Sequence, residues 1–275
     1  MVIYMKEETV SVVIPMYNAE RTIMDTLDSV KNQTYITYIK EIFIIDDGST
    51  DSSEQCVAAY MQSNPELPVT YIKQKNSGVS SARNHGIRLS TSKWIALLDS
   101  DDAWHSDKLE KQIEAIKSHP EIVFLGTGHL NKPFVRKGKV IRELYKADLY
   151  DLFWSFFPVT PSVLFRRDAV KTVGYFDETQ SYCEDMNYYM RFVVHCNYYY
   201  LPEKLVDIDL GKSFHGEKGL TSNLQGMHQG EMKNLRELRD EKYVSIGFYV
   251  FFCFYLTLKY WRRLIRHKIT CLRKK

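Results

Sequence analysis

The chain has 275 residues, which is long enough for one large α/β domain with a small appendage and too long for a peptide-like scaffold. Hydrophobic residues make up 44% and charged residues 26%, with 13 Gly and 8 Pro, so extensive disorder and collagen-like or low-complexity repeats are excluded. The five cysteines include no Cys-x-x-Cys pair, and we therefore expect neither a disulfide framework nor a zinc knuckle.

The net charge of +3 is unevenly distributed along the chain. Residues 259–275 contain eight Lys or Arg and no Asp or Glu. The rest of the chain therefore has 29 of the 37 basic residues and all 34 acidic ones. An acidic main body disfavours nucleic-acid binding, because a phosphate-binding surface needs an excess of Lys and Arg. The first residues contain no apolar segment with a cleavage site, so we expect no export and a cytoplasmic location.

Short runs of β-branched residues alternate with helical spacing over the first 110 residues. The runs at 10–15, 42–45, 69–73 and 94–98 predict strands, and Ile23, Leu27 and Val30 lie on one face of a predicted helix after the first run. This alternation predicts a mostly parallel sheet with helices on both faces. Ligands of such sheets bind beyond the carboxyl ends of the strands.

The alternation weakens after residue 120, where aromatic and loop-rich stretches precede a predicted helix in EDMNYYMRFVV. We expect residues 1–240 to form one domain with a soft internal boundary near 117. Its first half, 1–117, carries the polar strand ends, and its second half, 118–240, shapes and covers the site. No internal repeat is visible.

Residues 241–275 form a third segment, first apolar and then basic. The uncharged run at 243–258 would be about 24 Å long as a helix, shorter than the roughly 30 Å hydrocarbon core of a bilayer. The pattern that follows favours a helix lying on an anionic membrane surface, with a core or dimer helix and a solvated tail as the alternative. Its apolar face holds Trp261, Leu264, Ile265 and Ile269, and Arg262, Arg263, Arg266 and Lys268 lie largely on the other face.

Two polar clusters follow the first two predicted strands. SVVIPMYN at 11–18 ends in a turn whose backbone and Tyr17 ring can face a planar base, and a plain turn with Asn18 near a helix N-cap is the simpler interpretation. In IIDDGSTD at 44–51, Asp46 and Asp47 close a buried strand and need hydrogen-bond donors, which a ligand's base or ribose can supply. We favour Asp47 over Asp46 as the ligand contact.

A third cluster, WIALLDSDDAW, follows the fourth predicted strand. Asp99 and Asp101 can converge on a hard divalent cation once the strand has ended, because Mg²⁺ and Mn²⁺ prefer oxygen ligands and share them with phosphates. Helix-capping acids are the alternative, with Asp102 as the candidate cap. Upstream, in KNSGVSSARNHGI, Arg83 with Asn84 suits either phosphate or ribose oxygens, and Arg83 can equally pair with the acidic strand ends.

Glu184 and Asp185 stand at the predicted start of a helix in SYCEDMNYYMR. Capping alone explains acidic residues there, since a helix N-terminus stabilises anions. A general base that takes a proton from a hydroxyl also needs to be ionised and fixed on a defined element. The residues by themselves leave both interpretations open.

Taken in order, SVVIPMYN, DDGSTD, NSGVSSARNHGI, LLDSDDAW, GYFDE and CED resemble the motifs of the bacterial family 2 glycosyltransferases of the GT-A fold, over about residues 10–195. The resemblance implies a Rossmann-like α/β fold with a mixed, mostly parallel sheet flanked by helices, to which the C-terminal helix adds a membrane-associating extension. It implies an inverting, metal-dependent transferase with a UDP-sugar donor and Mn²⁺ or Mg²⁺. The halves 1–117 and 118–240 would then bind nucleotide and acceptor.

The resemblance also implies roles by position. Pro15, Tyr17 and Asp47 match the family's uracil and ribose contacts, with Arg83 as a further donor contact. Asp99 and Asp101 match its D-x-D metal motif, with Asp101 as the direct ligand. Asp185 matches the acid taken as general base, and Glu184 is its neighbour in the ED pair. Downstream of Val206 the resemblance is loose, and Lys212, His215 and Lys218 are candidates for contacts to the diphosphate or metal.

The basic tail indicates a subgroup of these enzymes. The chain resembles transferases that extend a sugar on undecaprenyl diphosphate at the inner face of the plasma membrane during bacterial O-antigen or capsule synthesis. This implies transfer of glucose or galactose to lipid-linked GlcNAc or GalNAc by a peripheral membrane protein, and leaves a homodimer open.

Two other functions were weighed against this one. A non-catalytic nucleotide-sugar-binding partner in a polysaccharide assembly complex would keep Tyr17 and Asp47 but would not need the D-x-D and ED acids. A nucleotidyltransferase would need a Gly-rich basic loop after the first strand, and the sequence contains none there.

Overall fold

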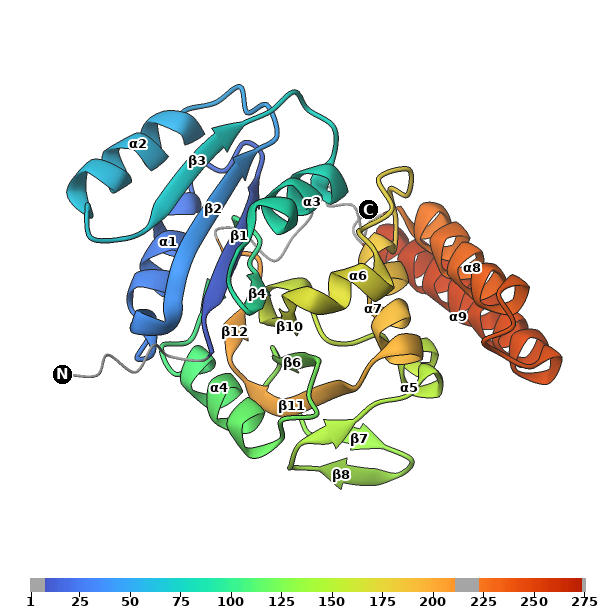
Figure 1. Cartoon of the computed structure of the whole chain (residues 1–275). Helices are drawn as coiled ribbons and strands as arrows, with labels where there is room; N and C mark the ends of the chain where they lie inside the picture. Colours follow the sequence, from blue (N-terminus) through green and yellow to red (C-terminus); the bar gives the residue numbers. More distant parts are fainter. Residues whose placement is uncertain (1–7, 211–222, 274–275) are drawn as a thin grey trace.

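The computed structural model describes residues 8–210 and 223–273 (Figure 1). Within them, one eight-stranded sheet runs through the centre of the molecule. Its strands, in spatial order, are β3 (Val69–Lys73), β2 (Ile39–Asp46), β1 (Val10–Met16), β4 (Trp94–Leu97), β10 (Leu164–Arg166), β6 (Phe124–Gly128), β11 (Tyr198–Lys204) and β9 (Tyr145–Lys146).

The first four strands of that order are parallel, as the alternating pattern predicted. Strand β10 runs antiparallel to both of its neighbours, β6 and β11 are parallel to each other, and β9 is antiparallel to β11. The predicted mixed, mostly parallel sheet is confirmed. Two short pairs lie outside it, β5 (Ala103–Trp104) with β12 (Val206–Asp207), and β7 (Phe134–Arg136) with β8 (Lys139–Ile141).

Helices cover both faces of the sheet, which explains why every residue of β1 is buried. Alternate side chains of β1 point to opposite faces: Val12 and Ile14 join one core cluster and Val13 the other. The first cluster contains Ile23, Leu27 and Val30, the predicted apolar face of α1. That face of the sheet carries α1 (Ile23–Lys31), α2 (Ser53–Ser63) and α4 (Lys108–Ser118), and the opposite face carries α3 (Val79–Leu89), α5 (Leu149–Trp154) and α7 (Glu184–His195).

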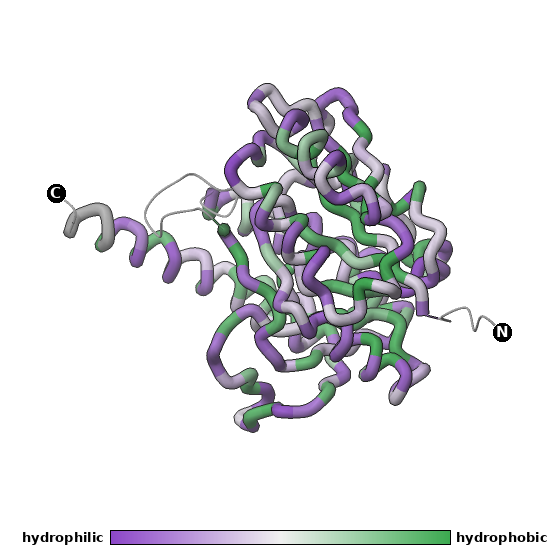
Figure 2. Tube along the Cα trace, turned by 90° about the vertical axis from the view of Figure 1, so that its left-hand side faces the viewer, coloured by the Kyte–Doolittle hydropathy of each residue, from purple (hydrophilic) through white to green (hydrophobic). Residues whose placement is uncertain are grey.

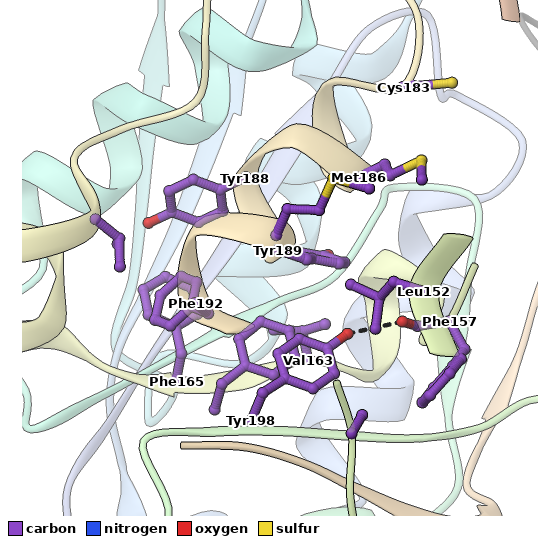
Figure 3. Packing of buried hydrophobic residues seen from close by; sticks show 14 of the residues in the cluster. Leu152, Phe157, Val163, Phe165, Cys183, Met186, Tyr188, Tyr189, Phe192 and Tyr198 are labelled. Carbon is purple, nitrogen blue, oxygen red and sulfur yellow. Dashed lines mark hydrogen bonds between the residues drawn. The ribbon is translucent and has the colours of Figure 1, made fainter. Parts of the chain in front are cut away.

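An aromatic core fixes α7 on the second half of the sheet (Figure 3). Tyr188, Tyr189 and Phe192 of α7 are fully buried in it. Tyr198 stacks on Phe124 with ring centroids 4.2 Å apart, and its hydroxyl donates a 2.7 Å hydrogen bond to the Phe157 carbonyl oxygen. Because these contacts hold α7, they also set the position of the acidic residues at its start. The short helix α6 (Val170–Val173) packs against α7.

The chain continues into two long antiparallel helices, α8 (Leu224–Asp240) and α9 (Ile246–Arg273), at the right of Figure 1. The apolar and basic parts of the predicted third segment therefore belong to one continuous helix. Its last turns extend away from the body of the molecule (Figure 2). Among the described helices, none combines the length and the apolar character needed to cross a membrane.

Candidate functional site

A cavity of about 920 Å³ opens where β1, β2 and β4 end. Parallel strands bring their carboxyl ends to one edge of the sheet, so residues far apart in the sequence meet there. The wall includes Pro15, Tyr17, Asp47, Arg83, Asp99, Asp101 and Glu184. Seven of the eight residues that the sequence assigned to the site thus surround one cavity. Asp185 is the exception and is not among the lining residues.

The two turns that follow β1 and β2 brace each other at the cavity. Asn18 has a left-handed backbone with φ 50°, and its side-chain oxygen accepts a 2.9 Å hydrogen bond from the Thr50 amide. The Asn18 amide in turn donates to the Ser49 hydroxyl at 3.0 Å. Helix α1 begins at Ile23, after Thr22. The interpretation of Asn18 as a helix N-cap is therefore wrong, because its side chain connects the two turns instead.

Asp47 lies at the bottom of this braced region with 5% of its surface exposed. Its carboxylate accepts hydrogen bonds from the Gln74 side chain at 2.9 Å and from the Ser77 and Gly78 amides at 2.8 Å each. The protein itself thus supplies the donors that the sequence argument sought in a ligand. Two carboxylate oxygens offer about four acceptor positions, which leaves capacity for one further donor from the cavity.

Asp46 differs from its neighbour, because it is fully buried and does not line the cavity. It accepts from the Ser49 amide at 2.7 Å and from the Tyr71 hydroxyl at 2.6 Å, which holds the turn after β2. Asn84 is also structural. Its amide group donates to the Phe176 carbonyl at 2.9 Å and to Glu178 at 2.8 Å, so the expected contact of Asn84 with phosphate or ribose is wrong.

Arg83 joins two acidic segments at the cavity wall. Arg83 is 4% exposed, and its guanidinium forms ion pairs with Asp99 at 2.8 Å and with Glu184 at 3.2 Å. Burial alone would lower the pKa of Arg83, but the two carboxylates outweigh it and raise that pKa above its usual range. Of the two interpretations left open for Arg83, the structure shows the pairing with acids. The side chain still lines the cavity.

Asp99, Asp101 and Asp102 follow β4 in a tight turn. The Ser100 carbonyl accepts from the Thr22 and Thr26 hydroxyls at 2.8 and 3.0 Å, which ties the turn to α1. Asp102 is 6% exposed and accepts from the Asp209 amide at 2.8 Å. Its burial, followed by the charges of the neighbouring aspartates, raises the pKa of Asp102 to about 8.

Asp102 is therefore not the predicted helix cap. Helix α4 begins at Lys108, with Asp107 at the N-cap position. The buried Asp102 instead holds the chain that leaves β12 against the cavity, where Leu210 forms part of the wall.

The acids at the cavity do not form an enclosed metal centre. Within residues 8–210 and 223–273, no group of three or more His, Cys, Asp or Glu side chains is placed to enclose a metal ion. Asp99 and Asp101 both line the cavity, and Asp99 is already partly neutralised by Arg83. A divalent ion bound here would take one or two protein carboxylates and complete its shell with water and ligand phosphates, which is the pattern usual for Mg²⁺.

Glu184 and Asp185 begin α7, directly after Cys183, whose backbone is left-handed with φ 56°. Glu184 extends to the cavity and to Arg83, and the half-buried Asp185 accepts a 2.7 Å hydrogen bond from the Met186 amide. Burial, and then the charge of Glu184, raise the pKa of Asp185 to about 7, against a smaller opposite effect of Arg83. A carboxyl group that titrates near neutral pH is suited to proton transfer.

The sequence argument missed Gln74 and Leu210. Gln74 follows β3 and orients Asp47, while its side-chain oxygen lies 2.9 Å from His85 Nδ1. A lone glutamine after a strand has no distinguishing pattern, so the only available signal was its position next to NSGVSSARNHGI. Lys212, His215 and Lys218 lie outside the described residues.

Comparison with known proteins identifies the family. Residues 11–174 match glycosyl transferase family 2, and the chain therefore belongs to this family. It is 41% identical over 105 residues to the putative teichuronic acid biosynthesis glycosyltransferase TuaG of Bacillus subtilis, a match covering 38% of this chain and 40% of that relative. It is 36% identical over 115 residues to the amylovoran biosynthesis glycosyltransferase AmsB of Erwinia amylovora, covering 41% and 37%. The matches thus span well under half of these two relatives.

Solved structures share the fold. The TarS 1–349 structure from S. aureus in complex with UDP-GlcNAc aligns with a TM-score of 0.66 and 21% identity, covering 84% of this chain and 66% of that one. The mannosyltransferase PcManGT from Pyrobaculum calidifontis in complex with GDP-Man and Mn²⁺ also aligns with 0.66, at 17% identity, covering 86% and 65%. The predicted GT-A fold is confirmed.

Proposed function

We propose that this family 2 chain transfers a hexose, with glucose or galactose favoured, from a UDP-sugar to a sugar carried on a lipid diphosphate. The observation that supports this most is the meeting of Tyr17, Asp47, Asp101 and the Arg83–Glu184 pair around one cavity at the carboxyl ends of parallel strands. The UDP-GlcNAc bound by TarS and the GDP-Man bound by PcManGT support a nucleotide-sugar donor.

The nucleotide would occupy the part of the cavity between the turns after β1 and β2. The Tyr17 side chain is 51% exposed there and offers an aromatic surface for uracil. Asp47 is fixed by three donors of the protein and keeps acceptor capacity for a uracil N–H or a ribose hydroxyl. Pro15 closes the wall behind them.

The residues at the end of β4 fit a divalent ion. Asp101 would be its main ligand. Asp99 would be a weaker ligand, because it already forms an ion pair with Arg83. When bound, Mn²⁺ or Mg²⁺ would stabilise the negative charge on the departing diphosphate. The protein's own contribution is Arg83, which pairs with both Asp99 and Glu184 and so offsets part of the repulsion among the acidic groups at the cavity.

Asp185 is the proposed general base. Its ionised carboxylate takes the proton of the acceptor hydroxyl, whose oxygen attacks the anomeric carbon of the donor sugar. The bond from that carbon to the UDP oxygen breaks, UDP leaves with the electron pair, and the anomeric configuration inverts. The pKa near 7 allows Asp185 to hold this proton until it passes to solvent.

The proposed acceptor is an undecaprenyl-diphosphate-linked sugar, such as GlcNAc or GalNAc, in O-antigen or capsule synthesis. The pathways named for TuaG and AmsB, teichuronic acid and amylovoran, support a role in a bacterial polysaccharide. We place the protein in the cytoplasm, peripheral on the inner face of the plasma membrane, because the basic tail suits the anionic leaflet on which such an acceptor is carried.

A panel of UDP-sugars tests this function. Each sugar is incubated with Mn²⁺, the full chain and synthetic lipid-diphosphate GlcNAc or GalNAc, and the product linkage is read by NMR. We expect one hexose to be transferred with inversion. Tight UDP binding without transfer from any UDP-sugar in the panel would instead support a non-catalytic nucleotide-sugar-binding partner.

A further inference from the structure

One face of α9 carries a row of exposed apolar side chains, here called the α9 stripe. The exposed fractions of these side chains range from 46% to 77%. Successive members are three or four residues apart, so they follow one side of the helix over about 35 Å. The stripe consists of Ile246, Val250, Phe254, Leu258, Trp261, Ile265 and Ile269.

The opposite side of α9 holds the helix on the protein. Phe252 and Leu256 are fully buried, and Lys259 and Arg263 pair with Glu231 of α8 at 3.0 and 3.7 Å. Because the core already uses this other side, the stripe is the outward face of α9. The part of the chain that the structure describes leaves the stripe exposed, although an apolar row of this length is costly to expose.

We propose that the α9 stripe is the surface by which the protein docks on an anionic lipid leaflet, with the helix axis lying along the membrane plane. This deepens the proposed function, on which it rests for the membrane-bound acceptor. Apolar and aromatic side chains on one face, with basic residues beside them, are the features of helices that lie at the headgroup level.

The charges around the stripe complement anionic lipids. Residues 242–275 contain no Asp or Glu. At 100° per residue, the exposed Arg262 lies at the edge of the stripe and the exposed Arg266 about 60° beyond that edge, towards the side packed on α8. The exposed Lys268 lies within the arc of the stripe, where its long side chain can extend to the headgroups. Each basic residue close to such a surface strengthens binding, so the leaflet is attracted to the same side that exposes the apolar row.

Helix α5 extends the docking surface beside α9. Trp154 is 52% exposed and stacks on Tyr255 with ring centroids 4.8 Å apart, and Tyr150 is 48% exposed near Phe251. Tyr and Trp gather at membrane interfaces because each has an apolar ring and a polar tip.

The spacing of the stripe disfavours a second copy of the chain as the occupant. A helix pair needs an apolar repeat of 3.5 residues on average to keep its seam facing the partner. The stripe steps mostly by four residues, so at 100° per residue it spreads over an arc of about 140°. A flat lipid surface accommodates such a broad face, whereas a single partner helix does not.

Vesicle sedimentation of the full chain tests the proposal. The Phe254→Ser/Trp261→Ser double variant is compared with Val135→Ser/Val140→Ser, which removes two apolar side chains of the β7–β8 hairpin that are 46% and 52% exposed. On vesicles of phosphatidylcholine with phosphatidylglycerol, we expect the first variant to bind at least about tenfold more weakly, and the second to bind like the parent. Arg262→Gln/Arg266→Gln should reduce the preference for phosphatidylglycerol over phosphatidylcholine alone.

Two results would overturn the docking surface. One is unchanged vesicle binding by the Phe254→Ser/Trp261→Ser variant. The other is a lipid-free dimer, seen by light scattering, that this variant converts to monomer, which would assign the stripe to a second copy. UDP affinity, measured calorimetrically in each variant, shows whether the donor site is intact. Vesicle binding by a parent protein that transfers no sugar would count against the proposed function alone.

Discussion

Asp185 and Glu184 are adjacent residues with different surroundings, and this difference separates their roles. Glu184 pairs with Arg83 at 3.2 Å and forms part of the cavity wall. The raised pKa of Asp185, about 7, arises from burial and from the nearby charge of Glu184. The charge of Glu184 thus adds to the effect of burial on the pKa of Asp185.

This arrangement predicts a pH profile. If ionised Asp185 is the base, kcat/KM falls as the pH is lowered through about 7, because the carboxylate becomes protonated. Asp185→Asn should reduce transfer by about 10² or more and leave UDP affinity intact. Glu184→Gln serves as the comparison. It removes a charge that raises the pKa of Asp185, so the fall in kcat/KM should occur at lower pH. If kcat/KM of Asp185→Asn still fell as the pH was lowered through 7, another residue would be the base.

Lys108 is a buried amine on the far side of the sheet from α7. It is fully buried, donates a 2.8 Å hydrogen bond to the Gln112 side chain, and has its Nζ 4.0 Å from the centre of the Trp104 ring. Burial lowers the pKa of Lys108 well below its ordinary value. The unfolded chain therefore binds a proton at Lys108 that the folded chain lacks. As a result, the free energy of unfolding decreases as the pH falls below about 10.

Lys108→Met removes this proton linkage. The free energy of unfolding of the variant, relative to the parent, should rise as the pH is lowered from about 10, by up to about 1.4 kcal/mol per pH unit, until the folded parent is itself protonated. Urea unfolding at several pH values measures this difference. Lys117→Met, at the exposed end of the same helix, should show almost no such slope below pH 10. Parallel pH curves for parent and Lys108→Met would contradict the neutral lysine.

At the scale of elements, α8 supports the turn that carries the acidic pair. Cys183 has a left-handed backbone, and its carbonyl accepts from the Asn234 side chain at 3.0 Å and from Gln180 at 3.1 Å. Gly230 allows α8 to approach this turn, because a Cβ at that position would stand 2.4 Å from the Tyr182 carbonyl oxygen. The helix thus packs directly on the backbone that positions Glu184 and Asp185.

Gly230→Ala should therefore lower kcat by displacing the turn, without changing the affinity for UDP, whose proposed contacts come from β1 and β2. Gly247→Ala is the matched control. Its added Cβ would meet only the Ser245 hydroxyl oxygen, at 3.9 Å, although it adds the same methyl group to a helix. Steady-state rates and calorimetry on the two variants separate the effects. Equal kcat values would show that α8 does not position the turn.

Local pattern predicted the elements of the first half well and those of the second half poorly. The strands and the buried face of α1 followed from apolar runs and spacing, since both are local properties. The insertion of β10 between β4 and β6 was not predictable. It depends on antiparallel pairing of Leu164 with both Ala96 and Leu125, across long stretches of chain. Likewise, the continuity of α9 depends on packing against α8.

For the molecule as a whole, the sheet order turns separate motifs into one site. Asp47 and Asp99 were predictable because each follows a buried strand whose carboxyl end meets the others. The ion pair between Arg83 and Glu184 was not predictable. The two residues are 101 positions apart and meet only because α3 and α7 share one face of the sheet. The donors to Asp47 were not predictable either, because they follow β3 and reach Asp47 only through the pairing of β3 with β2.

In the proposed function, Asp101 and its neighbours hold a cation-bound sugar diphosphate in the cavity at the strand ends. Calorimetric titration of UDP into the full chain, with and without Mn²⁺, and into Asp101→Ala tests it most directly. We expect Mn²⁺ to strengthen UDP binding by the parent and Asp101→Ala to lose this gain. The same Mn²⁺-dependent affinity in Asp101→Ala as in the parent would contradict it.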